Sequence, residues 1–209
     1  MGNYLRKNWF MLAVSVILLG MIVSFGYKLW FSPGASADDH LKPMKAAPNF
    51  QLTDVDGKIV NSQDLNGKVR LVYFFYSSCP DVCLPTSQIL SKVQDSLQSK
   101  GYLGNKAEII SITIDPAKDT PEVLKKFGDT FHAVPGVWRF LRGDEKKTVD
   151  LAEQYGIMVV KDKQGNISHS NAILIVDPKG VMRTYYDASD PQLDPEYIVK
   201  DVIALSKGK

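Results

Sequence analysis

The sequence predicts an α/β domain with a central mixed sheet flanked by helices, plus one N-terminal transmembrane helix. Strand-like runs alternate with helical patterns, and the last two strand-like runs flank a tight turn, which together predict the domain. An uncharged apolar run near the N-terminus predicts the membrane helix. The 209 residues suit one domain with an appendage, and a formal net charge of +2 gives no support for nucleic-acid binding.

The N-terminal segment has the features of a single-pass anchor. Residues 9–31 form an apolar run interrupted by one lysine, and a spanning helix needs about 20 such residues. Basic residues precede the run, whereas Asp38 and Asp39 follow it. The positive-inside rule therefore places residues 1–8 in the cytoplasm and the domain on the extracytoplasmic side of the cell membrane.

A cleaved signal peptide is the alternative for this segment. Ala35-Ser36-Ala37 has the small-residue form of a cleavage site. The apolar run is longer than a usual signal core and the site lies far downstream, which favours an uncleaved anchor. Residues 32–47 are rich in Pro, Ala, Ser and Asp and are predicted to be a linker, and residues 48–209 the domain.

The first half of the domain contains two buried-strand patterns with a helix between them. Val69–Tyr76 is a nearly continuous β-branched and aromatic run, typical of a strand buried on both faces, and Ala107–Ile114 resembles it. Thr86–Leu97 carries apolar residues at helical spacing. Short strands are expected at Phe50–Leu52 and Ile59-Val60.

The second half continues the alternation. Thr120-Pro121-Glu122 has the order of a helix start, with a cap, a proline and an acid. The turn Asp177–Gly180 predicts a hairpin between its flanking apolar runs. The remaining expected elements are strands at Val137–Leu141, Ala172–Val176 and Val181–Tyr186, a helix at Lys146–Tyr155 and a last helix from Asp194 through Ser206. This order of elements is that of the thioredoxin fold.

The two cysteines of the chain, Cys79 and Cys83, lie between a buried strand and a helix. A loop this short removes little unfolded-state entropy when it is closed, so a chemical role is favoured over a structural one. Free backbone N–H groups and the helix dipole at such a junction favour a thiolate. The pair can bind one soft metal ion or form a disulfide, and the spacing leaves both open.

A soft metal ion such as copper(I) commonly takes a third donor, and imidazole is suitable. His40 falls in the predicted linker, and His132 ends the helix that begins near Thr120. His169 precedes the strand Ala172–Val176, where loops of an α/β sheet converge on a site. His169 is therefore the candidate third donor, with a surface or capping role as its alternative.

Several ordered motifs resemble the Sco (SenC) family of copper-handling proteins, over about Ala47 to Ser206. The matching segments are Gly67 through Phe74, Cys79-Pro80-Asp81-Val82-Cys83, Ser111 through Pro116 with Asp119-Thr120, Trp138 through Gly143, and His169-Ser170 followed by a strand and Asp177–Gly180. Two departures concern the site. The family usually has proline directly after the second cysteine, whereas here Leu84 intervenes before Pro85, and Ser77-Ser78 replaces a Thr-His-like pair. The first is expected to move the start or register of the helix that follows Cys83.

The resemblance implies a copper ion bound by Cys79, Cys83 and His169. It implies a metallochaperone, rather than a turnover enzyme, that assists assembly of the binuclear copper centre of cytochrome c oxidase. The expected partner is the copper-bearing subunit of that oxidase or a similar copper protein. The alternative is an extracytoplasmic thiol–disulfide oxidoreductase that reduces cysteines of a copper protein, with Cys79 attacking and Cys83 resolving. The loop from Tyr155 to Asn166 is a candidate recognition element.

Overall fold

The computed structural model describes residues 9, 11, 13–24 and 39–208. The chain divides into two compact units, Met1–Asp39 and His40–Lys209. In the first unit residues 13–24 are helical and mostly exposed. No helix within the described part of the chain is both long and apolar enough to cross a membrane. The predicted anchor over residues 9–31 lies partly outside the described residues, and residues 1–8 and Ala35-Ser36-Ala37 lie wholly outside them.

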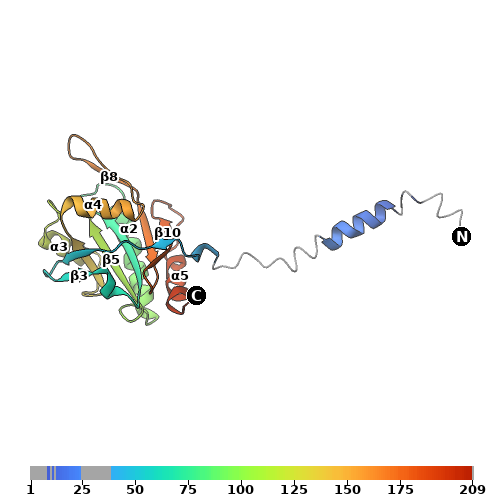
Figure 1. The fold of residues 1–209 in the computed structure, drawn as a ribbon, viewed down its shortest axis with the longest axis horizontal. Helices are drawn as coiled ribbons and strands as arrows, with labels where there is room; N and C mark the ends of the chain where they lie inside the picture. Colours follow the sequence, from blue (N-terminus) through green and yellow to red (C-terminus); the bar gives the residue numbers. More distant parts are fainter. Residues whose placement is uncertain (1–8, 10, 12, 25–38, 209) are drawn as a thin grey trace. The chain divides into compact units, whose positions relative to one another are not determined.

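The second unit is built on an eight-stranded sheet with the order β1-β10-β9-β4-β5-β6-β2-β3 (Figure 1). Strands β4, β5 and β6 run parallel, whereas β9 is antiparallel to β4 and β2 is antiparallel to β6. The bounds are β1 Lys45–Ala46, β2 Gln51–Asp54, β3 Ile59–Asn61, β4 Val69–Phe75, β5 Ala107–Thr113, β6 Trp138–Arg142, β9 Ala172–Val176 and β10 Val181–Asp187. The predicted α/β thioredoxin-like fold with a central mixed sheet is confirmed.

Four helices and two short 3-10 turns complete the unit. The predicted cap Thr120 is present, because it accepts the N–H of Val123, and Asp194 caps the last helix by accepting the N–H of Glu196. The helices are α2 Cys83–Ser99, α3 Pro121–Thr130, α4 Glu145–Gln154 and α5 Pro195–Ser206, and the 3-10 turns are η1 Asp39–Leu41 and η2 Ser62–Leu65.

Helices cover both faces of the sheet. Successive residues of a strand point to opposite faces of the sheet. Phe74 and Phe75 of β4 therefore identify the helix that packs on each face. The ring of Phe75 lies 5.0 Å from that of Phe127 in α3, while the ring of Phe74 lies 5.5 Å from that of Tyr155, which ends α4. Ser91 of α2 donates to the carbonyl oxygen just beyond α3, so α2 shares the face of α3. The core strand β4 is thus enclosed on both sides, as its apolar run predicted.

A second, two-stranded sheet was not predicted from the sequence. Strands β7 Val159–Lys161 and β8 Ile167–His169 form an antiparallel hairpin, with Val159 opposite His169. The carboxylate of Asp162 accepts the backbone N–H groups of Gln164 and Asn166 and closes the turn. The segment expected to be a loop over 155–166 therefore includes β7. Each strand is only three residues long, too short for an apolar alternation that would have predicted it.

Two residues of the segment predicted to be a linker belong to the sheet. Lys45 and Ala46 form β1 and pair with Met182 and Val181 of β10. Upstream of β1, the side chain of Leu41 is buried in the core. The compact unit therefore begins before residue 48, because backbone pairing and burial hold this segment against β10.

Candidate metal centre

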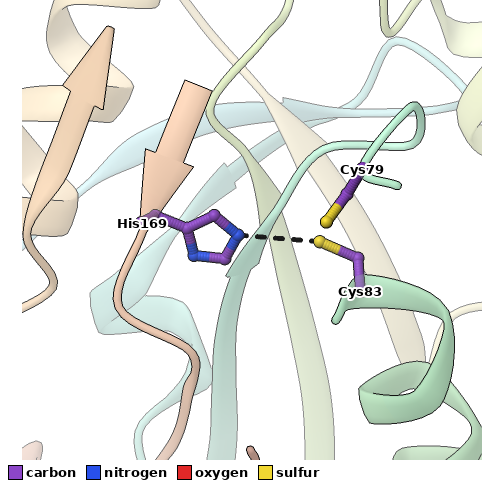
Figure 2. A group of neighbouring side chains, drawn as sticks. All are labelled: Cys79, Cys83 and His169. Atoms are coloured by element: carbon purple, nitrogen blue, oxygen red, sulfur yellow. Dashed lines mark hydrogen bonds between the residues drawn. The ribbon is translucent and has the colours of Figure 1, made fainter. Parts of the chain in front are cut away.

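Cys79, Cys83 and His169 come together from three separate parts of the fold (Figure 2). Cys79 follows a turn at the end of β4, Cys83 is the first residue of α2, and His169 ends β8. Their ligand atoms lie within 4.8 Å of one another, and the Sγ atom of Cys83 is 3.6 Å from the Nε2 atom of His169. No other group of three His, Cys, Asp or Glu side chains among the described residues is close enough to hold a metal ion.

The two other histidines lie apart from this site. The Nε2 atom of His40 is 2.6 Å from a carboxylate oxygen of Asp201 in α5. His132 is exposed just beyond α3 and has a φ of 53°, in the left-handed region. Of the histidines considered in the sequence analysis, the structure brings His169 alone to the cysteines.

The cysteine segment leaves β4 through a turn and then enters α2. The N–H of Cys79 donates to the carbonyl oxygen of Tyr76, which closes the turn. Cys79 therefore precedes the helix, so the two cysteines do not share a helical face as i and i+4 positions. Leu84 and Pro85 lie in the first turn of α2, where backbone N–H groups have no helical partner and proline costs little. Leu84 is 49% exposed and Cys83 is fully buried, so the sulfur lies in the core while Leu84 lies at the surface.

Cys79 is placed to carry a thiolate. Burial opposes ionisation, but hydrogen bonds from the Cys83 thiol and from the backbone N–H groups of Asp81, Val82 and Cys83 outweigh it and lower the pKa of Cys79. The N-cap residue Val82 offers no side-chain cap, so the sulfur of Cys79 takes that place at the start of α2. Cys79 also lines a cavity of about 550 Å³ that reaches His169.

Cys83 has the opposite character. Burial, followed by its hydrogen bond to Cys79, raises the pKa of Cys83 to about 12. The two shifts share one contribution, because a proton held on Cys83 is donated to the sulfur of Cys79. Without a metal ion, Cys79 is therefore the cysteine of the pair that ionises first, and Cys83 keeps its proton.

The ring of His169 is oriented for metal binding. Its Nδ1 atom lies 3.0 Å from the carbonyl oxygen of Ser170, and a carbonyl oxygen only accepts, so Nδ1 carries the proton. The lone pair of Nε2 then faces Cys83. Burial lowers the pKa of His169, which favours the neutral ring. Tyr76 holds β8 in place by donating from its hydroxyl to the carbonyl oxygen of Ile167 at 2.7 Å.

Two groups of polar residues around the cysteines were missed by sequence reasoning. Under Cys83, the hydroxyl of Tyr73 donates to Asn171 at 3.2 Å, and Asn171 donates to Thr86 at 3.1 Å. Behind Cys79, the buried carboxylate of Asp119 accepts from Ser77. Tyr73, within the apolar run of β4, was the signal available for the first group. Asp119, in the Ser111–Thr120 block, was the signal available for the second.

The donors suit a soft metal ion. Two cysteine sulfurs and one neutral imidazole form a set that favours copper(I), and zinc(II) accepts the same types of ligand. The same sulfurs can instead form a disulfide, because both cysteines are free. The geometry therefore supports metal binding and thiol chemistry at one place.

Comparison with known proteins places the chain among relatives of the same fold. A SCO2-like protein of Rickettsia prowazekii is 34% identical over 152 residues, covering 68% of this chain and 70% of that protein. The structure of BsSco, a member of the Sco family of cytochrome c oxidase assembly proteins in which a disulfide switch was identified, superposes with a TM-score of 0.70 at 26% identity, covering 80% of this chain and 98% of its own.

A copper-bound structure is also similar. ScoI of Bradyrhizobium japonicum with copper bound has a TM-score of 0.64 at 27% identity and covers 77% of this chain and 99% of its own. The sequence profile of SCO1/SenC matches residues 38–206, which include β1 through α5. The chain belongs to the SCO1/SenC family.

Proposed function

We propose that the protein is a copper metallochaperone that takes up one copper ion on Cys79, Cys83 and His169. One observation carries the proposal: the three ligand atoms lie within 4.8 Å of one another. They are supplied by three different parts of the fold, namely a turn, the start of a helix and a hairpin. The cargo is handed on for assembly of the binuclear copper centre of cytochrome c oxidase. The copper bound in the ScoI structure supports the choice of metal. The membership of BsSco in a family of cytochrome c oxidase assembly proteins supports the destination of the ion.

The residues act as a preformed receptor for the ion. Cys79 supplies a thiolate, and Cys83 gives up its proton when a copper ion binds, since the ion replaces that proton as the partner of both sulfurs. His169 supplies Nε2. The cavity beside Cys79 and His169 leaves room for a ligand of an acceptor protein to approach the ion before His169 dissociates from it.

Thiol–disulfide exchange is the second candidate function, and the unequal cysteines favour it. A lowered pKa and a position on the cavity wall make Cys79 the attacking thiolate, while buried Cys83 is the resolving thiol. Cys79 attacks one sulfur of a partner disulfide, which forms a mixed disulfide and releases the other partner sulfur as a thiolate. Cys83 then loses its proton to solvent, attacks Cys79 and releases the second partner sulfur as a thiolate. The internal disulfide forms and the partner is reduced by two electrons.

The proposed location follows from the apolar run over residues 9–31. We assign this run to a single-pass anchor in the cell membrane, residues 1–8 to the cytoplasm and the domain to the extracytoplasmic side. Labelling of single cysteines introduced at residues 3 and 45, in a variant lacking Cys79 and Cys83, with a membrane-impermeant maleimide tests this topology. Labelling at residue 45 alone is expected in intact cells.

Copper(I) titration of the reduced full chain tests the leading function. In competition with a chromogenic copper(I) chelator, the protein is expected to bind one equivalent. His169→Ala is expected to weaken binding about tenfold or more, because one donor of three is lost. His132→Asn is the matched histidine control, chosen because asparagine tolerates the left-handed backbone there. Absence of stoichiometric binding by the unaltered chain would overturn the proposal.

A trapping experiment tests the second function. Cys83→Ser removes the resolving thiol, so a mixed disulfide between Cys79 and a model peptide disulfide is expected to accumulate. The matched variant Cys79→Ser leaves the buried thiol and is expected to trap little. Equal trapping by both variants would contradict the assignment of Cys79 as attacker.

A further inference from the structure

The carboxylate of Asp119 lies behind the turn that carries Cys79. Asp119 is fully buried, two residues before α3. Its two oxygens are 3.2 Å and 3.1 Å from the backbone nitrogen of Ser77, and they also accept from the Ser77 hydroxyl and the Thr113 hydroxyl. Asp119 thus joins the end of β5 to the turn at the end of β4.

The partners of this carboxylate are neutral donors. Burial of a carboxylate costs free energy unless hydrogen bonds replace its lost hydration, and here backbone and hydroxyl groups do so. An apolar residue would fill the same space without that cost. What the carboxylate adds is a fixed position for Ser77, and Ser77 is two residues from Cys79.

The position of Cys79 decides what the cysteine pair can do. A disulfide requires the two sulfurs to approach to about 2.05 Å. In the structure both cysteines are free, and their sulfurs sit at metal-ligand separation, within the 4.8 Å group. Cys83 is fully buried in the first turn of α2. The two sulfurs are therefore brought together more easily by movement of the Tyr76–Cys79 turn than by movement of Cys83.

We propose that Asp119 is a positioning residue that holds the cysteine pair in its dithiol, metal-binding geometry and disfavours the disulfide. By fixing Ser77 it opposes the movement of Cys79 that disulfide formation requires. Asp119 thus sets the balance between copper binding and thiol–disulfide exchange. This inference rests on the proposed function, in which the same two sulfurs serve both reactions.

The measurement is the equilibrium of the cysteine pair with reduced and oxidised dithiothreitol, made on the full chain without copper. Each cysteine pair that is oxidised loses two protons and two electrons and forms one S–S bond, while one dithiothreitol disulfide is reduced to two thiols. Acid quenching, alkylation of free thiols and mass spectrometry give the oxidised fraction. Asp119→Asn places an N–H₂ group against the donors of Ser77 or Thr113, so the turn is released.

Asp119→Asn is expected to shift the equilibrium constant about tenfold toward the disulfide, which is about 30 mV more negative in reduction potential. Ser77→Ala removes one donor and keeps the backbone N–H, and a shift of about threefold in the same direction is expected. Should Asp119→Asn fail to fold, Ser77→Ala decides the outcome.

Asp177→Asn is the matched control. Asp177 is also buried and organises a turn, accepting from the N–H groups of Lys179 and Val181, but it lies at the other end of β9 from the site. It is expected to lower the melting temperature and leave the equilibrium constant unchanged. If Asp119→Asn and Ser77→Ala stay within about twofold of the unaltered chain, or shift toward the dithiol, the inference is overturned. Because copper is absent, this result is independent of whether the chain binds copper.

Discussion

The Nε2 atom of His169 lies 3.6 Å from the Sγ atom of Cys83, although 86 positions separate the two residues in the chain. A hairpin carries His169 to the start of α2, and the carbonyl oxygen of Ser170 holds the opposite ring nitrogen. The imidazole is therefore oriented before any ion arrives. Pre-orientation of this kind reduces the conformational freedom lost on metal binding.

The protonation of His169 predicts a pH dependence of copper(I) affinity. Burial lowers the pKa of His169, so Nε2 is free at neutral pH and becomes protonated only as the pH falls through that lowered value. Affinity is expected to weaken with falling pH, and the part due to His169 should disappear in His169→Ala. Competition titrations at several pH values measure this, and an identical pH profile for the two proteins would contradict the assignment.

The same shift predicts a pH dependence of stability. The folded chain disfavours the charged ring, whereas the unfolded chain binds the proton with the ordinary pKa of 6.5. The free energy of unfolding is therefore expected to fall as the pH drops below 6.5, until the folded pKa is reached. Urea denaturation of the reduced protein at about pH 7.5 and about pH 5.5 measures the loss, which should be smaller in His169→Gln.

The unequal cysteines predict selective alkylation. Cys79 has a lowered pKa and lines the cavity, while the pKa of Cys83 is raised to about 12 and its side chain is fully buried. Iodoacetamide is expected to modify Cys79 at least about a hundredfold faster than Cys83 near neutral pH, since the thiolate is the reactive form. Peptide mapping by mass spectrometry after brief exposure gives the ratio. Faster modification of Cys83 would reverse the assignment of attacker and resolver.

Tyr73 predicts an effect transmitted through hydrogen bonds. Its hydroxyl donates to Asn171 while Cys83 is a thiol, and it favours the thiolate by turning that hydrogen to the sulfur when Cys83 ionises. Tyr73→Phe is expected to weaken copper(I) binding about threefold to tenfold and to cost about 1 kcal/mol of stability. Tyr185→Phe, at a side chain that is 59% exposed, is the matched control and should change neither. Equal affinity in both variants would assign Tyr73 a packing role alone.

The half-exposed position of Leu84 predicts that the site tolerates substitution of this residue. Leu84 occupies the position where the Sco family usually has proline, yet it is half-exposed and Cys83 stays buried beside it. Leu84→Ala is expected to change copper(I) affinity less than about threefold and stability less than about 0.5 kcal/mol. A large loss of affinity, measured by the same chelator competition, would mean that the extra residue shapes the site after all.

Much of the fold could be predicted because its signals are local. The apolar run of β4 marks a strand enclosed on both faces, and the caps Thr120 and Asp194 mark helix starts through contacts with residues two or three positions away. The hairpin of β7 and β8 escaped prediction because strands of three residues are too short to show an apolar pattern. Its turn depends on the Asp162 side chain rather than on a buried face.

For the site, the sequence by itself determined that a pair of cysteines lies at a strand–helix junction. Strand burial, helix spacing and the closeness of Cys79 and Cys83 are all properties of neighbouring residues. Only the tertiary structure decided how His169 reaches Cys83 and that Asp119 holds the turn before Cys79. Both contacts join segments far apart in the chain, so their geometry depends on the packing of the whole sheet, which no local pattern encodes.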